Sequence, residues 1–493
     1  MGSEPDNITT ANTEKTTYDK TFKTMRIGVC EMQGWRSSME DAAIVLPNFE
    51  SHTSLFGVLD GHGGSIISEF VSVNFKNVLV RCKSYKKGHY DKALFETFLL
   101  MDELLKHKKI NNFIYETHYQ KEKEKQKEEK GINNKYKNEN IVKLRFENGE
   151  LDFDLDEIDL GNEKDSYETV VFDYKNKLLI TKKNLEKIIE TSSTTADDSK
   201  IRIDTESNKE EEKSTKNLQL SDIFFQQSGK MNSSLNGLPS FDEVFDVKKC
   251  RLKFHQKQKP VPPTQEENNS SNSLKYQPFI AYEMGTTANI MLIKNNVIYI
   301  ANVGDSLSVM YKDGKAYNLN REHQVVIESE KERVLKSGAT IQGYRINGML
   351  NLTRALGDIR FKKDKKLKRD EQSVLAIPEI TRIDDIDNVD FIVMGCDGIW
   401  DCVKRQLLCE YLENEIAENP NRKLSDILAT IFDKCISPIM GKVLGTDNMS
   451  CIVIQFLHNH NKSIEENIKI HKVDLNIQKD KSEDIIQNKN KTN

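Results

Sequence analysis

Short apolar or alternating stretches, separated by turn-forming residues, occupy the first part of the chain. Residues 25–30, 42–46 and 55–59 lie between Gly, Pro, Asn and Ser in this way, which is typical of β-strands. In 66–79 and 93–105, apolar residues recur every three or four positions, as in helices that pack one face on a sheet. The pattern therefore predicts strands followed by two helices.

A second set of strand-like runs lies in the later part of the chain. Residues 286–293, 296–304 and 306–314 predict an antiparallel meander, whose last run ends in an Asp313-Gly314 turn. Periodic or apolar runs that follow predict three helices and a last strand, over 325–336, 403–416, 424–440 and 449–456.

The composition changes between about residues 108 and 275. KEKEKQKEEK at 121–130 has nine charged residues in ten, which is typical of a solvated helix or a disordered segment. Alternation around the Asn148-Gly149 turn, and two apolar runs within 170–181, predict islands of structure. We expect a low-complexity charged insertion that could dock a partner.

The residues on either side of this insertion, 22–107 and 276–458, carry enough apolar side chains for one substantial core. Since both parts contain strands and helices, the fold class predicted is α+β. Residues 1–21 and 459–493 are polar and lack periodicity, so we expect an N-terminal segment and a C-terminal tail outside the core.

Composition agrees with a compact domain diluted by polar segments. The 493 residues are 37% hydrophobic and 30% charged, while 21 Phe and 15 Tyr exclude a fully disordered chain. The formal net charge of −5 gives no electrostatic reason to expect nucleic-acid binding, and it does not imply a basic partner either.

Cysteines and the N-terminus bear on localisation. Eight scattered cysteines without a CxxC pair are typical of reduced thiols, and neither a signal peptide nor an apolar run of membrane-spanning length is found. We expect an intracellular protein, cytoplasmic or nuclear, with no membrane span. Gly2 raises the question of N-myristoylation, but that pattern needs Ser or Thr where the chain has Asp6.

Acidic residues stand beside the apolar runs at five places. Strongly apolar strands lead straight into Asp60 and Asp397, and a buried carboxylate needs compensation. Several close carboxylates repel one another unless cations lie between them, and oxygen ligands suit Mg²⁺ or Mn²⁺. A turn is the simpler interpretation of any single Asp-Gly. The acidic positions are Glu40-Asp41, Asp60, Asp305, Asp397 and Asp447.

Seven segments carry a resemblance to a known family. They are QGWRSSMEDA, FGVLDGHGG, MGTTAN, IANVGDS, NGMLNLTRALGD, FIVMGCDGIWD and GTDNMSCIVI. In this order they resemble the metal-dependent protein phosphatases (PPM), the type 2C serine/threonine phosphatases. The resemblance implies an αββα sandwich of two antiparallel sheets flanked by helices, with a binuclear metal site at one end.

The resemblance also implies metal ligands. Asp60 would bridge two Mg²⁺ or Mn²⁺ ions, the Gly61 carbonyl would bind one of them, and Asp397 with Asp447 would complete the other. Two such ions lower the pKa of a shared water and so supply a hydroxide that attacks phosphorus.

Three further acidic residues have more open roles. Glu40 and Asp41 would act directly or through metal-bound waters. Asp305 matches the family position for a third, more weakly bound metal, although a turn carboxylate after a strand is the alternative.

Two basic residues would act on the substrate. Arg36 corresponds to the phosphate-binding arginine of the family, and its guanidinium fork fits two phosphoryl oxygens. His62 matches the proposed general acid that protonates the departing Ser or Thr oxygen.

Other positions match or depart from the family. Arg354 and Asp358 suggest a buried ion pair or a network that supports the site. His323 lies in a sequence that differs from the usual loop at Glu322, Gln324 and Val325. Leu307 replaces the Arg that most members have after GDS.

The sequence thus predicts a phosphatase that hydrolyses phosphoserine and phosphothreonine in proteins, with phosphorylated proteins as partners. A regulatory scaffold of the same fold with little catalysis is the alternative. The presence of Asp60, Asp397 and Asp447 argues against the scaffold, because pseudoenzymes can lose metal ligands without losing the fold. Hydrolysis of small phosphoesters would use the same ions and stays open.

Overall fold

The chain divides into two compact units, Met1–Val171 with Pro278–Asn493, and Phe172–Gln277. Nearly all residues with a described placement belong to the first unit. The computed structural model describes residues 10–22, 24–107, 110–112, 114–115, 169–173, 178–181, 280–384, 386, 389–440 and 444–457.

Sheet A has six strands, and each neighbouring pair in it is antiparallel. In spatial order they are β1 (Asn12–Thr21), β2 (Met25–Gly34), β18 (Met449–Phe456), β17 (Phe391–Gly395), β11 (Leu307–Lys312) and β12 (Lys315–Asn318).

Sheet B contains five antiparallel strands in the first unit. They are β3 (Ala42–Glu50), β4 (Thr53–Leu59), β9 (Ala288–Lys294), β10 (Val297–Val303) and β16 (Glu379–Ile383). Strand β6 (Thr169–Asp173) pairs with β16 in parallel through residues 169–171. Strand β7 (Leu178–Thr181) lies in the second unit.

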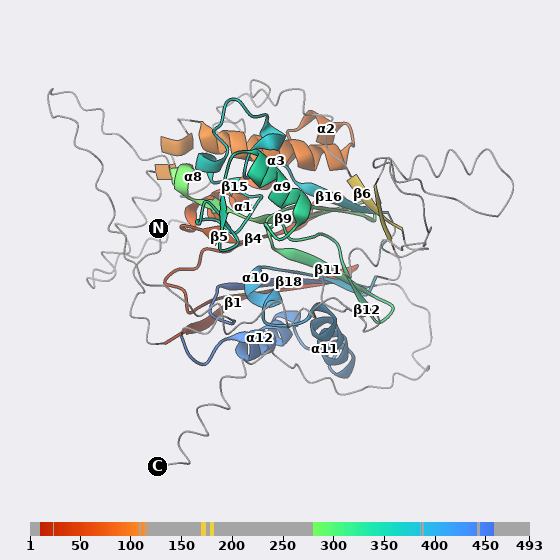
Figure 1. Cartoon of the computed structure of the whole chain (residues 1–493). Coiled ribbons are helices and arrows are strands. Elements are labelled where there is room, and N and C mark those ends of the chain that lie inside the picture. The colour runs from red at the N-terminus through yellow and green to blue at the C-terminus, as the bar shows by residue number, and fades with distance from the viewer. Residues whose placement is uncertain are drawn as a thin grey trace, which may run out of the picture. The chain divides into compact units, whose positions relative to one another are not determined.

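Helices cover the outer faces of both sheets (Figure 1). Helices α1 (Ile66–Leu79), α2 (Lys83–Lys86) and α3 (Tyr90–Lys106) lie over sheet B, while α11 (Arg405–Glu418) and α12 (Leu424–Cys435) lie over sheet A. The predicted αββα sandwich of antiparallel sheets is therefore confirmed.

Each helix layer is held by apolar burial. Phe70 of α1 and Phe98 of α3 are fully buried in one apolar cluster with Ile290 of sheet B, and Phe432 of α12 is fully buried in another with Val453 of sheet A. A side chain of this size contributes about 1.5–3 kcal/mol when it leaves water. The four layers follow from helices whose apolar residues share one face.

Smaller elements lie outside the two large sheets. A three-stranded sheet joins β5 (Gly61–His62), β8 (Gly285–Thr286) and β15 (Leu356–Gly357). The remaining elements are α8 (Ile280–Glu283), α9 (Glu328–Lys336), β13 (Ile341–Gln342), β14 (Arg345–Ile346), α10 (Asp397–Trp400) and the 3-10 turns η4 (Ile359–Phe361) and η5 (Arg369–Glu371).

Strand β1 is a difference from the sequence prediction, which placed residues 1–21 outside the core without an element. It forms the edge of sheet A and is mostly exposed. Lys15 forms a 2.5 Å ion pair with Asp433, and Asp19 accepts a hydrogen bond from the Ser425 amide at 3.1 Å. Backbone pairing and polar contacts to α12 hold this strand, so no apolar alternation marks it.

The predicted antiparallel meander is correct only for β9 and β10. Strand β11 belongs to the other sheet, so the chain crosses between the sheets at Gly304, Asp305 and Ser306. Gly304 has φ of +101°, and a Cβ there would lie 2.6 Å from the Thr287 side chain. The predicted Asp313-Gly314 turn is present, since it joins β11 to β12.

The boundary of the packed unit lies later than residue 107. Ile110 and Ile114 are 2% and 1% exposed within the sheet B core, and the Asn111 side chain accepts a hydrogen bond from the Ile280 amide. The Asn148-Gly149 turn and the tail after residue 457 lie outside the described residues. Among the described residues, no helix has the length and apolar character that a membrane span requires.

Candidate metal centre

Strand ends bring acidic residues from both sheets to one place. Asp60 directly follows β4 and Asp41 directly precedes β3, both in sheet B. Asp397 begins α10 just after β17 of sheet A, and Asp305 lies in the crossing between the sheets. Because β4 contacts β17 and β18, the strand ends that carry these acidic residues lie close together.

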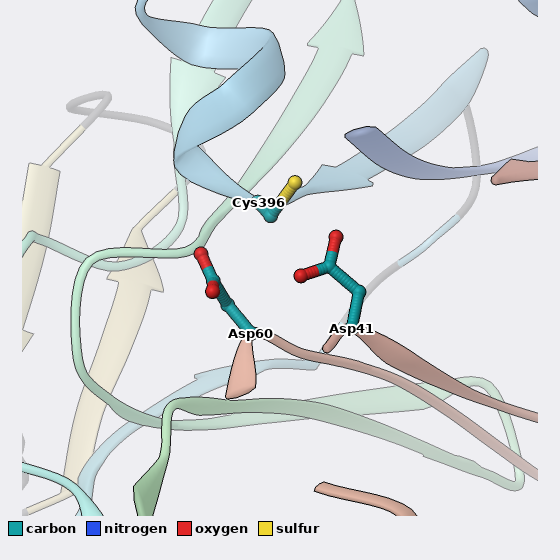
Figure 2. Close-up of side chains that lie close together, drawn as sticks. All are labelled: Asp41, Asp60 and Cys396. Atoms are coloured by element: carbon teal, nitrogen blue, oxygen red, sulfur yellow. The ribbon is translucent and has the colours of Figure 1, made fainter. Parts of the chain in front are cut away.

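Asp60 belongs to two groups of potential ligands. One carboxylate oxygen each of Asp60, Asp305 and Asp397 lie within 4.8 Å of one another, and so do oxygens of Asp41 and Asp60 with the Cys396 Sγ. Figure 2 shows the Asp41 and Asp60 carboxylates and the Cys396 thiol gathered around one space. A residue shared by two such groups can bridge two cations.

Burial and mutual repulsion raise the pKa values of these carboxyl groups. Burial, then Asp397, then Asp41 hold the pKa of Asp60 well above its ordinary range. Burial and the neighbouring Asp397 do the same to the pKa of Asp305. Burial raises the pKa of Asp41 to about 7 despite a hydrogen bond from Ser450.

Cations would remove this electrostatic cost, so the residues fit a metal centre. The pKa of Asp397 is raised to about 6, first by burial and then by Asp447. Carboxylate oxygens are the ligands that Mg²⁺ and Mn²⁺ prefer. Cys396 is a poor ligand for these ions, and burial holds its pKa well above the ordinary range, so it is a neutral thiol.

Asp447 pairs with Arg36 at the edge of the centre. The Nη2 of Arg36 lies 2.5 Å from the Asp447 Oδ2, and Arg36 remains 57% exposed. Burial opposes the charge on Arg36, but Asp447, Asp60 and Asp397 outweigh it and raise its pKa. Asp447 is in neither of the two ligand groups found among the described residues, although its charge acts on both.

Glu40 and Gly61 have structural contacts beside the centre. The Glu40 carboxylate accepts hydrogen bonds from the Ser38 hydroxyl at 3.0 Å and the Gly64 amide at 3.2 Å. Within the described part of the chain, Glu40 is in neither ligand group. A Cβ at Gly61 would lie 2.3 Å from the Glu40 carbonyl oxygen, so only glycine fits this close approach.

His62 is held by a buried carboxylate. Its Nε2 lies 2.6 Å from the Asp358 Oδ2, and the Asp358 side chain is 1% exposed. Burial opposes the charged imidazolium, but Asp358 outweighs it and raises the pKa of His62. This partnership was missed in the sequence, which paired Asp358 with Arg354 or with an unspecified network.

Arg354 supports a different region. It forms hydrogen bonds at 2.6 and 3.1 Å to the Oε1 of Glu330, whose other oxygen pairs with Arg333. Arg354 and Asp358 therefore do not form an ion pair with each other. The residue Glu330 was not predicted, because it lies in a helix whose charges look like a solvated face.

Residues around Asp305 explain two departures from the family pattern. Gln324 donates from Nε2 to the Asp305 Oδ2 at 3.0 Å, and the buried His323 accepts a hydrogen bond from the Gly304 amide at 3.2 Å. Leu307 is 1% exposed in the sheet A core, where an arginine would have to be desolvated.

A family comparison decides the assignment. The family model described as "Protein phosphatase 2C" matches residues 25–124 and 191–442. The chain belongs to the protein phosphatase 2C family. It is therefore a protein phosphatase of the serine/threonine class, a hydrolase family in which metal dependence is typical. Apart from Asp447, all site residues predicted from the sequence lie within the matched residues.

Curated relatives agree with membership in protein phosphatase 2C. "Probable protein phosphatase 2C 21" of Arabidopsis thaliana is 26% identical over 449 residues, covering 91% of this chain and 92% of the relative. "Probable protein phosphatase 2C 58" of Oryza sativa subsp. japonica is 27% identical, and the match covers 91% of this chain and 88% of the relative.

A comparison with solved structures gives a similarity to "serine-threonine phosphatase 2C from Toxoplasma gondii". The identity is 10% and the TM-score is 0.46, and the match covers 90% of this chain and 99% of the solved one.

Proposed function

We infer that this chain removes phosphate from phosphoserine and phosphothreonine in proteins, with two Mg²⁺ or Mn²⁺ ions at the candidate centre. The observation that supports this most directly is that the Asp60 carboxylate belongs to two groups of potential ligands, whose other acidic members are Asp305 with Asp397 in one group and Asp41 in the other. Their repulsion needs cations, and two cations beside one carboxylate are the requirement of a binuclear phosphatase.

The proposed ligands come from both groups. Asp60 would bridge the ions, Asp397 would hold one of them and Asp41 would hold the other, while Asp305 lies near enough to Asp60 and Asp397 to hold a third ion. Glu40, the Gly61 carbonyl and Asp447 would act on bound waters or complete the shell, and a third ion near Asp305 would be weaker. When bound, the ions would supply a nucleophilic water at neutral pH and neutralise phosphoryl charge.

Arg36 would hold the phosphoryl group. Its side chain is exposed enough to meet a substrate, and Asp447 keeps the guanidinium beside the carboxylate cluster. A planar fork can donate to two phosphoryl oxygens at once, which fixes the orientation of the phosphorus.

His62 would protonate the leaving oxygen. Because Nε2 faces Asp358, the Nε2 proton is committed to that carboxylate. The Nδ1 proton of the imidazolium is then the one available to a departing Ser or Thr oxygen. Asp358 is thus a positioning residue that also keeps His62 charged.

The test is phosphate release from a phosphothreonine peptide by the purified full chain, with Mn²⁺ and then with EDTA. Release in Mn²⁺ that stops in EDTA would support the proposal. A folded chain that binds Mn²⁺ by calorimetry yet releases no phosphate would instead support the scaffold alternative. A comparison with small metabolite phosphoesters would measure the preference for peptides.

A further inference from the structure

A cavity of 230 Å³ lies between α3 and the chain that follows Asp358, and its lining includes Asp102, Lys362 and Lys365. The Asp102 carboxylate in its wall accepts hydrogen bonds from Lys362 at 2.6 Å and from the Gly357 amide at 3.1 Å. Gly357 directly precedes Asp358, which holds His62. A hydrogen bond therefore joins the cavity wall to the residue next to Asp358.

The acidic residues in the cavity wall already have hydrogen-bond or ion-pair partners. Asp102 pairs with Lys362 and Lys106, and Glu103 pairs with Lys106 and Arg369. Asp364 accepts a hydrogen bond from the Lys366 amide. The carboxylates of the wall are thus satisfied before any ligand arrives.

The loop that carries the cavity has a surplus of positive charge. Residues 360–371 contain seven Lys or Arg against three Asp or Glu. Three of the seven, Arg360, Lys362 and Arg369, pair with the carboxylates of Glu283, Asp102 and Glu103 outside the loop, so four remain. Lys365, which lines the cavity, and the adjacent Lys366 are exposed, and neither has a carboxylate partner among the residues that the structure describes. Lys363 donates to the hydroxyl of Tyr282.

We propose that this basic loop, residues 360–371, binds acidic side chains that flank the phosphoresidue in substrate polypeptides. This inference rests on the proposed function and specifies its substrate class. Seven positions separate Asp358 from Lys365, so the two lie at most roughly 25 Å apart, the span of about seven extended residues. A substrate can therefore place its phosphoresidue at the centre and an acidic residue at the loop.

The test compares phosphothreonine peptides with Glu or with Gln at the seven positions on each side of the phosphoresidue. For the natural chain at low salt, we expect kcat/KM to be about tenfold higher for the Glu peptides, and the ratio to fall toward one at high ionic strength. The double variant Lys365→Glu with Lys366→Glu should bring the ratio to one or below. Equal kcat/KM for both peptides in the natural chain would overturn the proposal.

A matched charge reversal tests the location. Lys86 and Lys87 are also adjacent and exposed, but they lie beside the N-terminal end of α3, roughly 24 Å along that helix from Lys106. Lys86→Glu with Lys87→Glu should keep the Glu preference. If this control abolishes the preference as fully as the loop variant does, net charge and not the loop is responsible, and the proposal is wrong.

Binding separates this proposal from the proposed function. Fluorescence anisotropy with labelled, unphosphorylated Glu and Gln peptides needs no turnover. Tighter binding of the Glu peptide, lost in the loop variant, would support the loop even if the chain releases no phosphate. Equal binding together with normal turnover would leave the phosphatase proposal standing and refute the acidic docking loop.

Discussion

The Nε2 of His62 lies 2.6 Å from the Oδ2 of Asp358, although 296 positions separate the two residues in the chain. Gly285 permits this approach, because a Cβ there would lie 2.1 Å from that oxygen and 2.7 Å from the imidazole nitrogen. Asp358 has φ of 50°, and its amide donates to the Met284 carbonyl at 3.0 Å. Three separate segments of the small β5-β8-β15 sheet thus fix the position of the His62 imidazole.

Asp358→Asn should lower the pKa of His62, since the carboxylate that offsets burial is gone. An imidazolium donor is lost as pH rises through its pKa, so the alkaline limb of kcat for a phosphothreonine peptide should move to lower pH. Hydrolysis of nitrophenyl phosphate, whose leaving group needs no proton, should be slowed less. His62→Gln should show the same selectivity and should lose this alkaline limb, because the titrating imidazole is absent. Equal slowing of both substrates would make His62 a positioning residue.

Asp60→Asn should remove most activity and yet stabilise the metal-free protein. The buried carboxyl repels its acidic neighbours, so its replacement by an amide should raise the melting temperature in EDTA by about 2–4 °C for each 1 kcal/mol gained. The further rise on adding Mn²⁺ should be smaller than in the natural chain. Asp313→Asn, at an exposed turn with φ of 51°, is the control. It should change neither the melting temperature in EDTA nor the further rise on adding Mn²⁺. A lower melting temperature in EDTA would contradict the repulsion argument.

Arg36→Ala should lower kcat/KM on every phosphoester by an amount that corresponds to about 2–4 kcal/mol, because a charge-assisted contact to the transition state is lost. Arg36→Lys keeps the positive charge that faces Asp447 but lacks the planar guanidinium that can donate to two phosphoryl oxygens. This variant should therefore recover only part of the kcat/KM lost in Arg36→Ala. Steady-state kinetics on a peptide and an aryl phosphate measure both effects. An Arg36→Ala variant with unchanged kcat/KM would place this side chain outside the substrate site.

Glu379→Gln should reduce the acid sensitivity of folding. Burial opposes the charge on Glu379, but His323, Arg321 and Arg354 outweigh it and lower its pKa from 4.5 to about 2. A depressed pKa contributes stability above pH 4.5 that is lost as pH falls toward 2, about 3 kcal/mol in all. Urea unfolding in EDTA between pH 6 and pH 3 should therefore show a shallower loss in the variant. A parallel loss in both proteins would mean that Glu379 titrates normally.

Deleting residues 118–276 and joining the ends with a flexible linker should preserve hydrolysis of a small aryl phosphate, since every proposed ligand lies outside that span. If the deleted segment docks substrates or regulators, turnover of folded phosphoproteins should fall while aryl phosphate kinetics stay the same. A deletion that starts at residue 110 should be less stable by several kcal/mol, because it also removes the buried Ile110 and Ile114. A folded 118–276 deletion that fails on the aryl phosphate would show that the segment contributes to the site.

Local pattern was sufficient where one face of an element is buried. The prediction for 66–79 coincides with α1, and that for 449–456 coincides with β18, because apolar spacing reports burial directly. The gathering of Asp60, Asp305 and Asp397 also followed from local sequence, since each carboxylate stands at the end of an apolar strand.

The relationships that were missed are those between distant segments. Strand β1 is polar and held by backbone pairing, so its side chains carry no signal. Strand β11 lies in sheet A because it pairs with β17. The sequence of β11 alone does not indicate which strand it pairs with. The Gln324 contact to Asp305 is similar, because only the fold brings these two polar groups together.

The carboxylates of the centre come from both sheets, so the proposed ions would close one end of the sandwich while they serve catalysis. Asp41 and Asp60 belong to sheet B, and Asp397 follows sheet A. A related protein in which one of these carboxylates is replaced by a neutral side chain would lose phosphatase activity. It would also lose the repulsion between carboxylates that the ions offset. The step from enzyme to binding protein is therefore short in evolutionary terms, since the substitution that ends catalysis favours the metal-free fold.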